Sequence, residues 1–242
     1  MRGVLYFIER DLTKWTRSKI SVVASLAMPA AWLIFVGLTL PIKFNNSNYI
    51  DYITPGILVM TMLFASLAGG SLLIFDKMLG FLNKFLALPT PRESILFGKI
   101  LFITFRGIIQ STVILALALF LGVKIQSLTS IFLIYLVLFI FGILFSSIST
   151  TIALVVDDHD GYAAVNSMIS MPLFFTSSAL MPYEMMPSWL RILASLNPVS
   201  YAIDTARALF AGNFPMNGIV ELIVITVVVL VISVYTFRRA TV

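Results

Sequence analysis

The chain has 242 residues, of which 60% are hydrophobic and only 11% charged, and its mean hydropathy is +1.02. Soluble domains are roughly 45–50% apolar and about 25% charged, so no water-soluble fold could bury this much apolar surface. The formal net charge is +5, but Lys and Arg lie between apolar runs rather than in one basic stripe, which argues against a nucleic-acid partner. Cysteine is absent, which excludes disulfides and a cysteine nucleophile.

Six long apolar segments follow one another along the chain. Each has about the 20 residues that a helix needs to cross a bilayer, and none alternates as a barrel strand would. The first is too long for the apolar part of a removable signal peptide. We therefore predict an all-α integral membrane protein with a single transmembrane domain over residues 1–242. The predicted spans are residues 20–42, 52–75, 100–123, 131–156, 161–181 and 218–237.

The distribution of Lys and Arg predicts that both termini lie in the cytoplasm, because cytoplasmic loops carry more of these residues than external loops. In that orientation the inner segments hold Arg2, Arg10, Lys14, Arg17, Lys19, Lys77, Lys84, Arg92, Lys99, Arg238 and Arg239. The outer segments hold only Lys43, Lys124, Arg191 and Arg207.

The segment that precedes the first span is amphipathic. Val4, Ile8, Leu12 and Trp15 recur at helical spacing, and charged or polar residues occupy the other side. This pattern predicts an interfacial helix over residues 1–19 that lies on the inner leaflet.

A second amphipathic helix is predicted over residues 77–88, between the second and third spans. The stripe needs a partner, which is either lipid headgroups or protein. The apolar stripe consists of Met78, Phe81, Leu82, Phe85 and Leu86. The opposite face consists of Asp76, Gly80, Asn83, Lys84 and Ala87.

A sharp turn is predicted after this helix. Pro89 ends it, and Thr90-Pro91-Arg92-Glu93 has the pattern of a capping box with proline at the first helical position. The third span is therefore expected to begin with a capped helix.

Two apolar segments before the last span, residues 187–196 and 198–210, are each too short to cross a bilayer. Asn197-Pro198 stops the first segment and caps the second, and Gly212 suits a C-terminal cap. We predict an outer helical hairpin over residues 187–210 that dips into the outer leaflet.

The loop Asp157-Asp158-His159-Asp160 could hold Mg²⁺ or Mn²⁺, which prefer oxygen ligands. A membrane-embedded, metal-dependent lipid-modifying enzyme is therefore one alternative. Such an enzyme would need a second acidic motif facing the first, and no other inner loop supplies one. We favour a solvated turn, with no metal site.

The sequence lacks a nucleotide-binding motif. A P-loop needs Gly, four spacers and then Gly-Lys-Ser/Thr, whereas Gly98-Lys99 is followed by Ile100 and has Glu93 at the first glycine position. The lone histidine, His159, has no nucleophile motif beside it, so a Ser-His-Asp triad is not supported. No catalytic or cofactor-binding residue is predicted.

Charged residues in or beside the spans have local interpretations. Arg106 is expected to reach the inner interface by snorkelling, and Glu221 lies near the outer surface. Asp204 and Arg207, three residues apart, are expected to form a local ion pair. The scarcity of mid-span charges counts against a second alternative, a secondary transporter driven by an ion gradient.

Three parts of the chain together resemble the membrane subunit of type 2 ATP-binding-cassette exporters, and the resemblance covers nearly the whole chain. The first part is Thr54-Pro55-Gly56-Ile57-Leu58-Val59-Met60, and the second runs from Gly80-Phe81-Leu82 through Pro89-Thr90-Pro91-Arg92 to Gly98-Lys99. The third and strongest runs from Leu180-Met181-Pro182 through Pro187-Ser188-Trp189-Leu190 to Leu196-Asn197-Pro198-Val199-Ser200-Tyr201-Ala202-Ile203-Asp204.

The resemblance implies that residues 77–88 form the coupling helix, which contacts an ATPase subunit. Many members carry an acidic residue just after the position of Leu82, where this chain has Asn83 and Lys84, so the polar pairing with the ATPase differs here. The coupling residues implied by the resemblance are Gly80, Phe81, Leu82, Asn83, Lys84 and Phe85.

The resemblance also implies the partners and the cargo. Two copies of a cytoplasmic P-loop ATPase would bind ATP-Mg, while this chain would carry no cofactor of its own. A second copy of the chain, or a similar permease, would complete the path across a prokaryotic cell membrane. The expected cargo is an amphipathic drug, lipid or glycan-type molecule, exported by alternating access.

Overall fold

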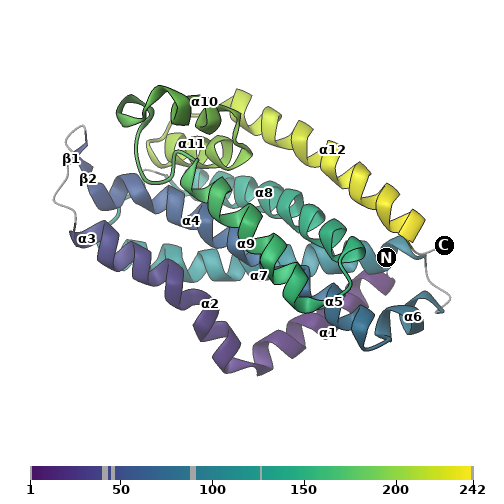
Figure 1. The fold of residues 1–242 in the computed structure, drawn as a ribbon. Helices are drawn as coiled ribbons and strands as arrows, with labels where there is room; N and C mark the ends of the chain where they lie inside the picture. Colours follow the sequence, from purple (N-terminus) through teal and green to yellow (C-terminus); the bar gives the residue numbers. More distant parts are fainter. Residues whose placement is uncertain (1, 40–42, 45–46, 88–90, 126, 241–242) are drawn as a thin grey trace.

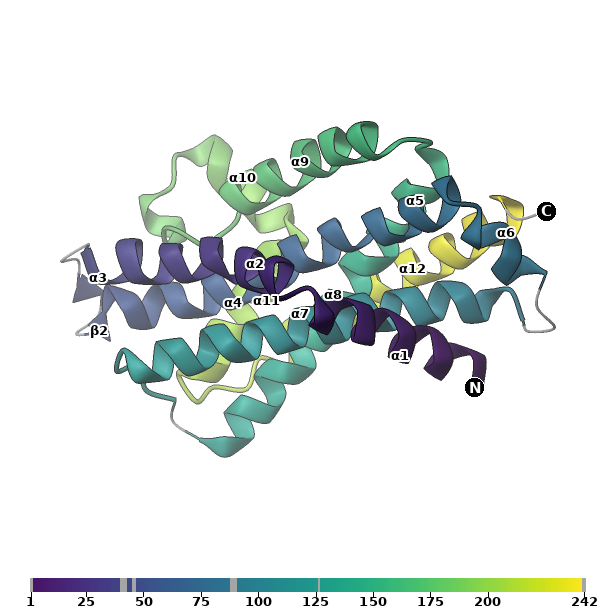
Figure 2. The ribbon, with the colours of Figure 1, turned by 90° about the horizontal axis from the view of Figure 1, so that it is seen from below.

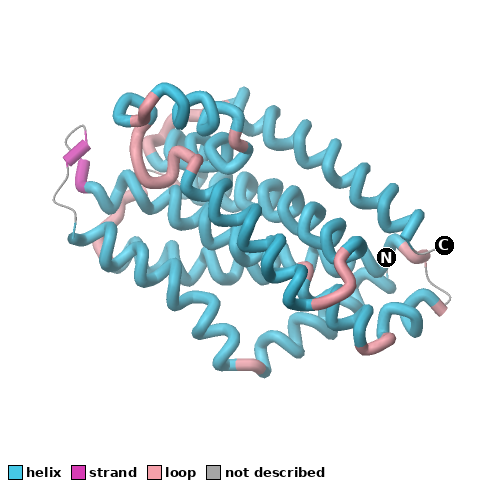
Figure 3. The backbone as a smooth tube through the Cα atoms, in the orientation of Figure 1, coloured by secondary structure: helices cyan, strands magenta, loops and turns pink. Residues whose placement is uncertain are grey.

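The computed structural model describes residues 2–39, 43–44, 47–87, 91–125 and 127–240, and these residues are almost entirely helical (Figure 3). The first part comprises α1 (Arg2–Arg17), α2 (Lys19–Ala31), the π-helical turn η1 (Trp32–Val36), α3 (Gly37–Thr39), and the antiparallel strand pair β1 (Lys43–Phe44) and β2 (Ser47–Asn48). The middle part comprises α4 (Tyr49–Gly69), α5 (Ser71–Met78), α6 (Phe81–Leu86), α7 (Glu93–Phe120) and α8 (Leu128–Val155). The last part comprises α9 (His159–Phe175), the 3-10 turn η2 (Tyr183–Met185), α10 (Ser188–Leu196), α11 (Pro198–Phe210) and α12 (Met216–Ala240).

Five helical segments within the described residues are long and apolar enough to cross a membrane. They coincide with the first four predicted spans and the last one, although the third begins at Glu93 rather than at residue 100. The five segments are Lys19–Val36, Tyr49–Met78, Glu93–Phe120, Leu128–Val155 and Met216–Arg239.

The predicted fifth span, residues 161–181, contains a shorter helix. α9 has 17 residues and ends at Phe175, so at about 1.5 Å per residue it is roughly 25 Å long. The Leu173 carbonyl group does not continue the helix, because it accepts from Asn197 Nδ2 at 2.7 Å while Ser177 N donates to Phe174 O. The chain therefore leaves the helix six residues before the predicted end.

α4 lies at the centre of the bundle. It packs against α7, α8, α9 and α11, and nearly all of its side chains are buried (Figures 1 and 2). The first and last candidate spans instead keep most of their residues exposed. The central core is apolar. Because lipid is as apolar as these side chains, helices in a bilayer associate through close packing rather than through hydrophobic burial from water.

The bundle has two distinct ends (Figure 1). One end holds α1, α5, α6 and both chain termini, and we call it the α6 end. The opposite end holds β1, β2, α10 and α11, and we call it the α10 end. A smaller apolar cluster that includes Phe7, Leu82, Ile95 and Phe237 fills the α6 end, separate from the main core.

Side chains of α8 and α9 form a hydrogen-bonded network with the backbone at the junction of α4 and α5. Gly70 N donates to Ser149 Oγ at 2.7 Å, and Ser149 Oγ donates to Leu67 O at 2.9 Å. The Tyr162 hydroxyl also donates to Leu67 O and lies 2.8 Å from Ser149 Oγ. The break in the helix at Gly70 is thus satisfied by side chains of α8 and α9.

We expect Ser149→Ala to lower the free energy of unfolding by about 1–2 kcal/mol, because the Gly70 N–H would remain buried without its acceptor. Thermal unfolding in detergent measures the change. The matched control is Ser167→Ala, since Ser167 is exposed and bonds only to a carbonyl of its own helix. Equal unfolding midpoints for the two variants would contradict a stabilising role for this hydrogen-bonded network.

Candidate functional site at the α6 end

The predicted helix over residues 77–88 is wrong as one continuous element. α5 continues to Met78, and Gly80 adopts φ +70° in the left-handed region that glycine favours. Leu79 N donates to Phe75 O at 2.9 Å and Gly80 N to Lys77 O at 3.1 Å, which closes α5 as a left-handed cap does. The chain then turns and α6 begins at Phe81, so α6 has only six residues.

The start of α7 differs from the predicted capping box, because Arg92 is its N-cap and makes no side-chain cap hydrogen bond, whereas Glu93 was predicted at the third helical position. Leu88, Pro89 and Thr90 lie outside the described residues. Glu93 does begin α7, and its Oε1 accepts from Arg238 Nε at 2.8 Å, which brings the end of α12 to the start of α7. The C-terminal helix therefore takes part in the α6 end.

The six predicted coupling residues divide into an inner and an outer group. Leu82 is buried, and the Phe85 ring packs edge-to-face on Phe7 at 5.2 Å. The Phe81 ring is 42% exposed, and Asn83 and Lys84 are exposed as well. The predicted apolar stripe therefore does not face a single partner, because Leu82 is buried in the apolar cluster and Phe85 packs on α1, whereas Phe81 is exposed.

α1 is held tightly between α6 and α7. Phe7 is buried between these helices and touches Phe85. On the other side, a Cβ added at Gly98 would lie 2.7 Å from the Cβ of Phe7, so α1 and α7 approach more closely than any larger residue would allow. This contact fixes α1 against the body of the bundle.

A cluster of four charged residues lies beneath α6 and joins three helices. Lys99 Nζ of α7 lies 2.8 Å from Asp11 Oδ2 of α1 and 2.5 Å from Asp76 Oδ2 of α5. Arg10 Nη2 lies 2.6 Å from Asp11 Oδ1 and 3.2 Å from Asp76 Oδ2. Asp76 was predicted on the polar outer face of the amphipathic helix, and this prediction is wrong because its side chain is only 9% exposed.

The cluster is electrically balanced, with two cations and two carboxylates. The Lys99 side chain is only 2% exposed, and removing an ion from water costs several kcal/mol, so each charge here depends on its partners. Burial alone would lower the pKa of Arg10, but Asp11 and Asp76 raise it overall. Arg10 also lies over the Phe85 ring at 4.6 Å, which connects the cluster to α6.

The sequence contained a signal for this cluster that the periodicity argument did not use. Asp76 and Lys99 stand at the ends of apolar segments, where an ionisable residue needs a partner. Opposite charges at the facing ends of two consecutive spans would have suggested that these ends meet.

The acidic loop between α8 and α9 has structural partners. Lys77 Nζ lies 2.6 Å from Asp157 Oδ1 and donates to Leu154 O in the last turn of α8 and to Val156 O just after it. Asp158 Oδ1 accepts from Gly161 N at 2.7 Å as the N-cap of α9, and His159 stacks on Phe75 at 4.8 Å. Within the described residues no group of three His, Cys, Asp or Glu side chains is placed to hold a metal ion.

The snorkelling prediction for Arg106 is wrong. Its Nη2 donates to Ala65 O at 2.7 Å, on the central helix α4. Asp76, which marks the level of Lys99, is more than ten residues further along α4 and α5. The guanidinium therefore lies within the bundle instead of extending to its end.

Asp204 and Arg207 form more than a local pair. Their ion pair measures 3.2 Å, and Asp204 also accepts from Ser178 Oγ and the Tyr183 hydroxyl, each at 2.7 Å. Arg207 lies over the Tyr52 ring at 3.9 Å, so α4, α11 and the segment after α9 meet here. Burial, and then the bond to Asp204, raises the pKa of Tyr183 to about 12, so this hydroxyl remains a donor.

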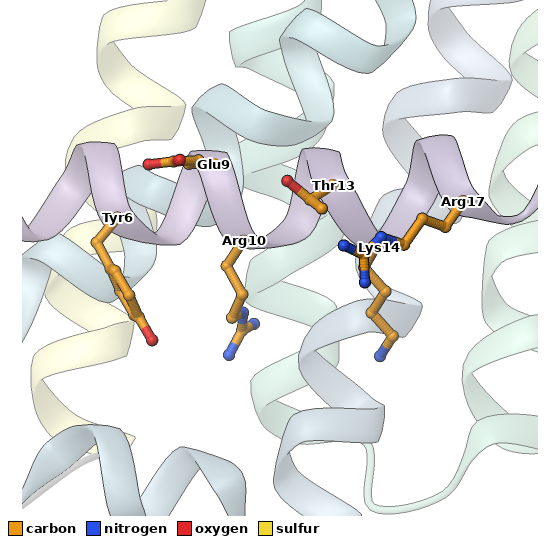
Figure 4. Close-up of a pocket in the computed structure, with 6 residues that line it drawn as sticks. All are labelled: Tyr6, Glu9, Arg10, Thr13, Lys14 and Arg17. Atoms are coloured by element: carbon orange, nitrogen blue, oxygen red, sulfur yellow. The ribbon is translucent and has the colours of Figure 1, made fainter.

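A hollow of about 520 Å³ lies along one face of α1 (Figure 4). It is separate from the buried face of α1, which carries Phe7 and Asp11. Its lining consists of Tyr6, Glu9, Arg10, Thr13, Lys14 and Arg17.

Comparisons with known proteins bear on the whole chain. The family model described as ABC-2 type transporter matches residues 2–211. The putative transport permease ycf38 of Cyanophora paradoxa is 35% identical over 219 residues, which cover 88% of this chain and 76% of that protein. The probable doxorubicin resistance ABC transporter permease protein DrrC of Mycobacterium tuberculosis is 27% identical, covering 90% of this chain and 80% of its own length. The daunorubicin resistance ABC transporter permease protein DrrB1 of Streptomyces coeruleorubidus is 25% identical, with coverages of 87% and 76%.

We expect Lys99→Met to destabilise the protein by about 3–5 kcal/mol, because Asp11 and Asp76 would lose their buried counter-ion. Thermal unfolding in detergent gives the measurement. Adding Asp76→Asn to Lys99→Met should recover part of the loss, since one uncompensated carboxylate is removed. If the two substitutions instead add independently, the four charges do not act as one cluster.

Proposed function

Because the chain belongs to the ABC-2 type transporter family and is a transport permease of an ABC transporter, we propose that it forms an ATP-driven export path as a dimer. The second subunit is another copy or a similar permease. Two copies of a cytoplasmic P-loop ATPase bind ATP-Mg and drive the cycle. The chain itself contributes no ATPase site and binds no cofactor.

The outward face of α6 supports this proposal. The exposed groups there are a phenylalanine, an amide and an ammonium group, from Phe81, Asn83 and Lys84. Met78 and Leu79, which are 57% and 62% exposed, extend the apolar part of the same turn. Such a surface of apolar anchors beside polar groups fits a protein partner, and Lys84 favours an acidic group on that partner.

The contacts between α6, α1 and the charge cluster explain how a movement of α6 would be transmitted to the membrane spans. Force on α6 passes through Phe85 to Phe7 and Arg10 of α1, and through the charge cluster to Lys99 of α7. α5 also continues into the central helix α4. A rigid connection of this kind would move α1, α4 and α7 together when the ATPase pair closes.

Energetically, ATP can drive the cycle only through a difference in affinity. A ligand shifts a two-state equilibrium by no more than its differential binding to the two states. In the proposed cycle, ATP favours the closed ATPase pair, and docking at α6 makes one orientation of the permease more stable in that state.

We further propose that the chain crosses the membrane six times with both termini in the cytoplasm. The five candidate spans alone would put the termini on opposite sides, whereas both termini lie at the α6 end (Figure 1). An added crossing by α9 resolves this, because its 17 residues reach the lower end of the length of known spanning helices. The α6 end then faces the ATPase.

The proposed cargo is an amphipathic drug, lipid or glycan-type molecule. Two relatives are described as doxorubicin or daunorubicin resistance permeases, which supports an amphipathic drug for this chain as well. The exposed apolar side chains of α2 and α9, among them Val23, Met28 and Met168, offer surfaces for a second subunit, for lipid and for such a cargo.

Replacing Phe81 with glutamate tests the docking surface. We expect Phe81→Glu to lower co-purification of the ATPase and ATP-driven export about tenfold or more, because loss of a buried aromatic anchor costs at least about 2 kcal/mol. The matched control is Phe214→Glu, since Phe214 is an exposed phenylalanine at the α10 end. Unchanged export by Phe81→Glu, in a protein that folds normally, would show that α6 is not the docking element.

Single cysteines test the topology, because the chain contains no cysteine that would give background labelling. We expect a membrane-impermeant maleimide to label Asn213→Cys in intact cells and to label Asn83→Cys only after permeabilisation. Asp160→Cys should behave like Asn83→Cys, and Met181→Cys like Asn213→Cys, if α9 crosses. Labelling of residues 160 and 181 from the same side would remove the sixth crossing.

A further inference from the structure

The hollow on α1 has a basic lining that the charge cluster does not neutralise. Arg10 belongs to that cluster, but Lys14 and Arg17 pair with no carboxylate among the described residues. Glu9 is the only carboxylate of the lining, so two cations outside the cluster, Lys14 and Arg17, face one anion. The hollow therefore has a cationic surplus near exposed Lys14 and Arg17.

The spacing of the lining residues puts them on one face of α1. Arg10 follows Tyr6 and Lys14 follows Arg10 at intervals of four residues, and Thr13 and Arg17 follow Arg10 and Lys14 at intervals of three. Intervals of three or four residues return side chains to nearly the same side of a helix. Figure 4 shows Tyr6, Arg10 and Lys14 extending from the same side of α1, with Arg17 folding back along the helix. Two hydroxyl donors, from Tyr6 and Thr13, accompany the cations.

The surroundings indicate a membrane surface. α1 leads within two residues into α2, a candidate span, and the first apolar side chain there, Ile20, is 85% exposed. Leu5 and Tyr6, 64% and 58% exposed, add apolar area beside the hollow. Basic groups flanked by exposed apolar side chains next to a span are the arrangement that binds a lipid surface.

From this combination we propose that the hollow binds the phosphate group of an anionic phospholipid. Lys14 and Arg17 neutralise the phosphodiester, and the hydroxyl groups of Tyr6 and Thr13 donate to its oxygens. The acyl chains lie along the exposed apolar side chains at the start of α2. The site does not depend on the proposed ATPase or on the direction of transport.

Brominated lipids test the site through Trp15, which follows Lys14 in the sequence of α1, is partly buried and does not itself line the hollow. The full chain with Trp32→Phe and Trp189→Phe is reconstituted into phosphatidylcholine vesicles that contain phosphatidylglycerol, and either lipid is brominated in turn. We expect brominated phosphatidylglycerol to quench Trp15 more strongly than brominated phosphatidylcholine at the same mole fraction. This preference should fall about fivefold for each basic residue removed by Lys14→Gln or Arg17→Gln, and it should weaken with salt.

A control variant of equal charge accompanies the measurement. Lys124→Gln with Arg239→Gln removes two positive charges from exposed residues outside the hollow, as many as Lys14→Gln with Arg17→Gln removes from its lining, and it should keep the preference. Native mass spectrometry of the chain with all its tryptophans provides a second measure, by counting the phosphatidylglycerol molecules that remain bound.

Four outcomes would overturn the proposal. The first is equal quenching by the two lipids in the parent chain, and the second is an equal loss of preference in the control variant. The third is an effect of Lys14→Gln and Arg17→Gln on co-purification of a protein partner without any effect on lipid, which would assign the hollow to that partner. Competition by inorganic phosphate at concentrations far below those of the lipid would assign it to a free anion.

Discussion

The arrangement of the α6 end depends on the buried charges of Asp11, Asp76 and Lys99, supported by Arg10. Lys99 is almost completely removed from solvent, and its two carboxylate partners come from α1 and α5. An ion in such a place is tolerated only with close counter-ions, so the three helices cannot separate without exposing or orphaning a charge. The cluster thereby fixes where α1 and the turn into α6 can lie.

This constraint decides which side chains of α6 face outward. A helix of six residues has little stability of its own, since short helices depend on tertiary packing. Here Leu82 is buried and Phe85 packs on Phe7 of α1, whereas Phe81, Asn83 and Lys84 face outward. The network around Asp204 and Arg207 has a comparable place at the α10 end, where it joins α4 to α11. The permease thus has a network of charged and polar side chains that joins helices at each end of an apolar bundle.

Much of the helical pattern could be predicted from the sequence, because length and continuous hydropathy decide which segments can cross a membrane. Asn197 caps α11 as the Asn-Pro pattern indicates, with its Oδ1 2.9 Å from Val199 N. The inner and outer groups of α6 could not be predicted, because periodicity cannot tell that Gly80 separates α5 from α6 or that Phe85 packs on Phe7 of α1. The partners of Asp76 and Arg106 lie on other helices, so local spacing misplaced both, whereas the predicted pair of Asp204 and Arg207 does form and gains Ser178 and Tyr183 as further partners.

The most direct test asks whether the charge cluster fixes the position of α1 relative to α6. It measures the distance between spin labels at Leu5→Cys on α1 and Asn83→Cys on α6. Both positions are exposed and the chain has no other cysteine. We expect one narrow distance distribution in the parent chain and a clearly broader one after Arg10→Gln, which removes the group that touches Asp11, Asp76 and Phe85. An equally narrow distribution after Arg10→Gln and after Lys99→Met, in folded protein, would contradict the account.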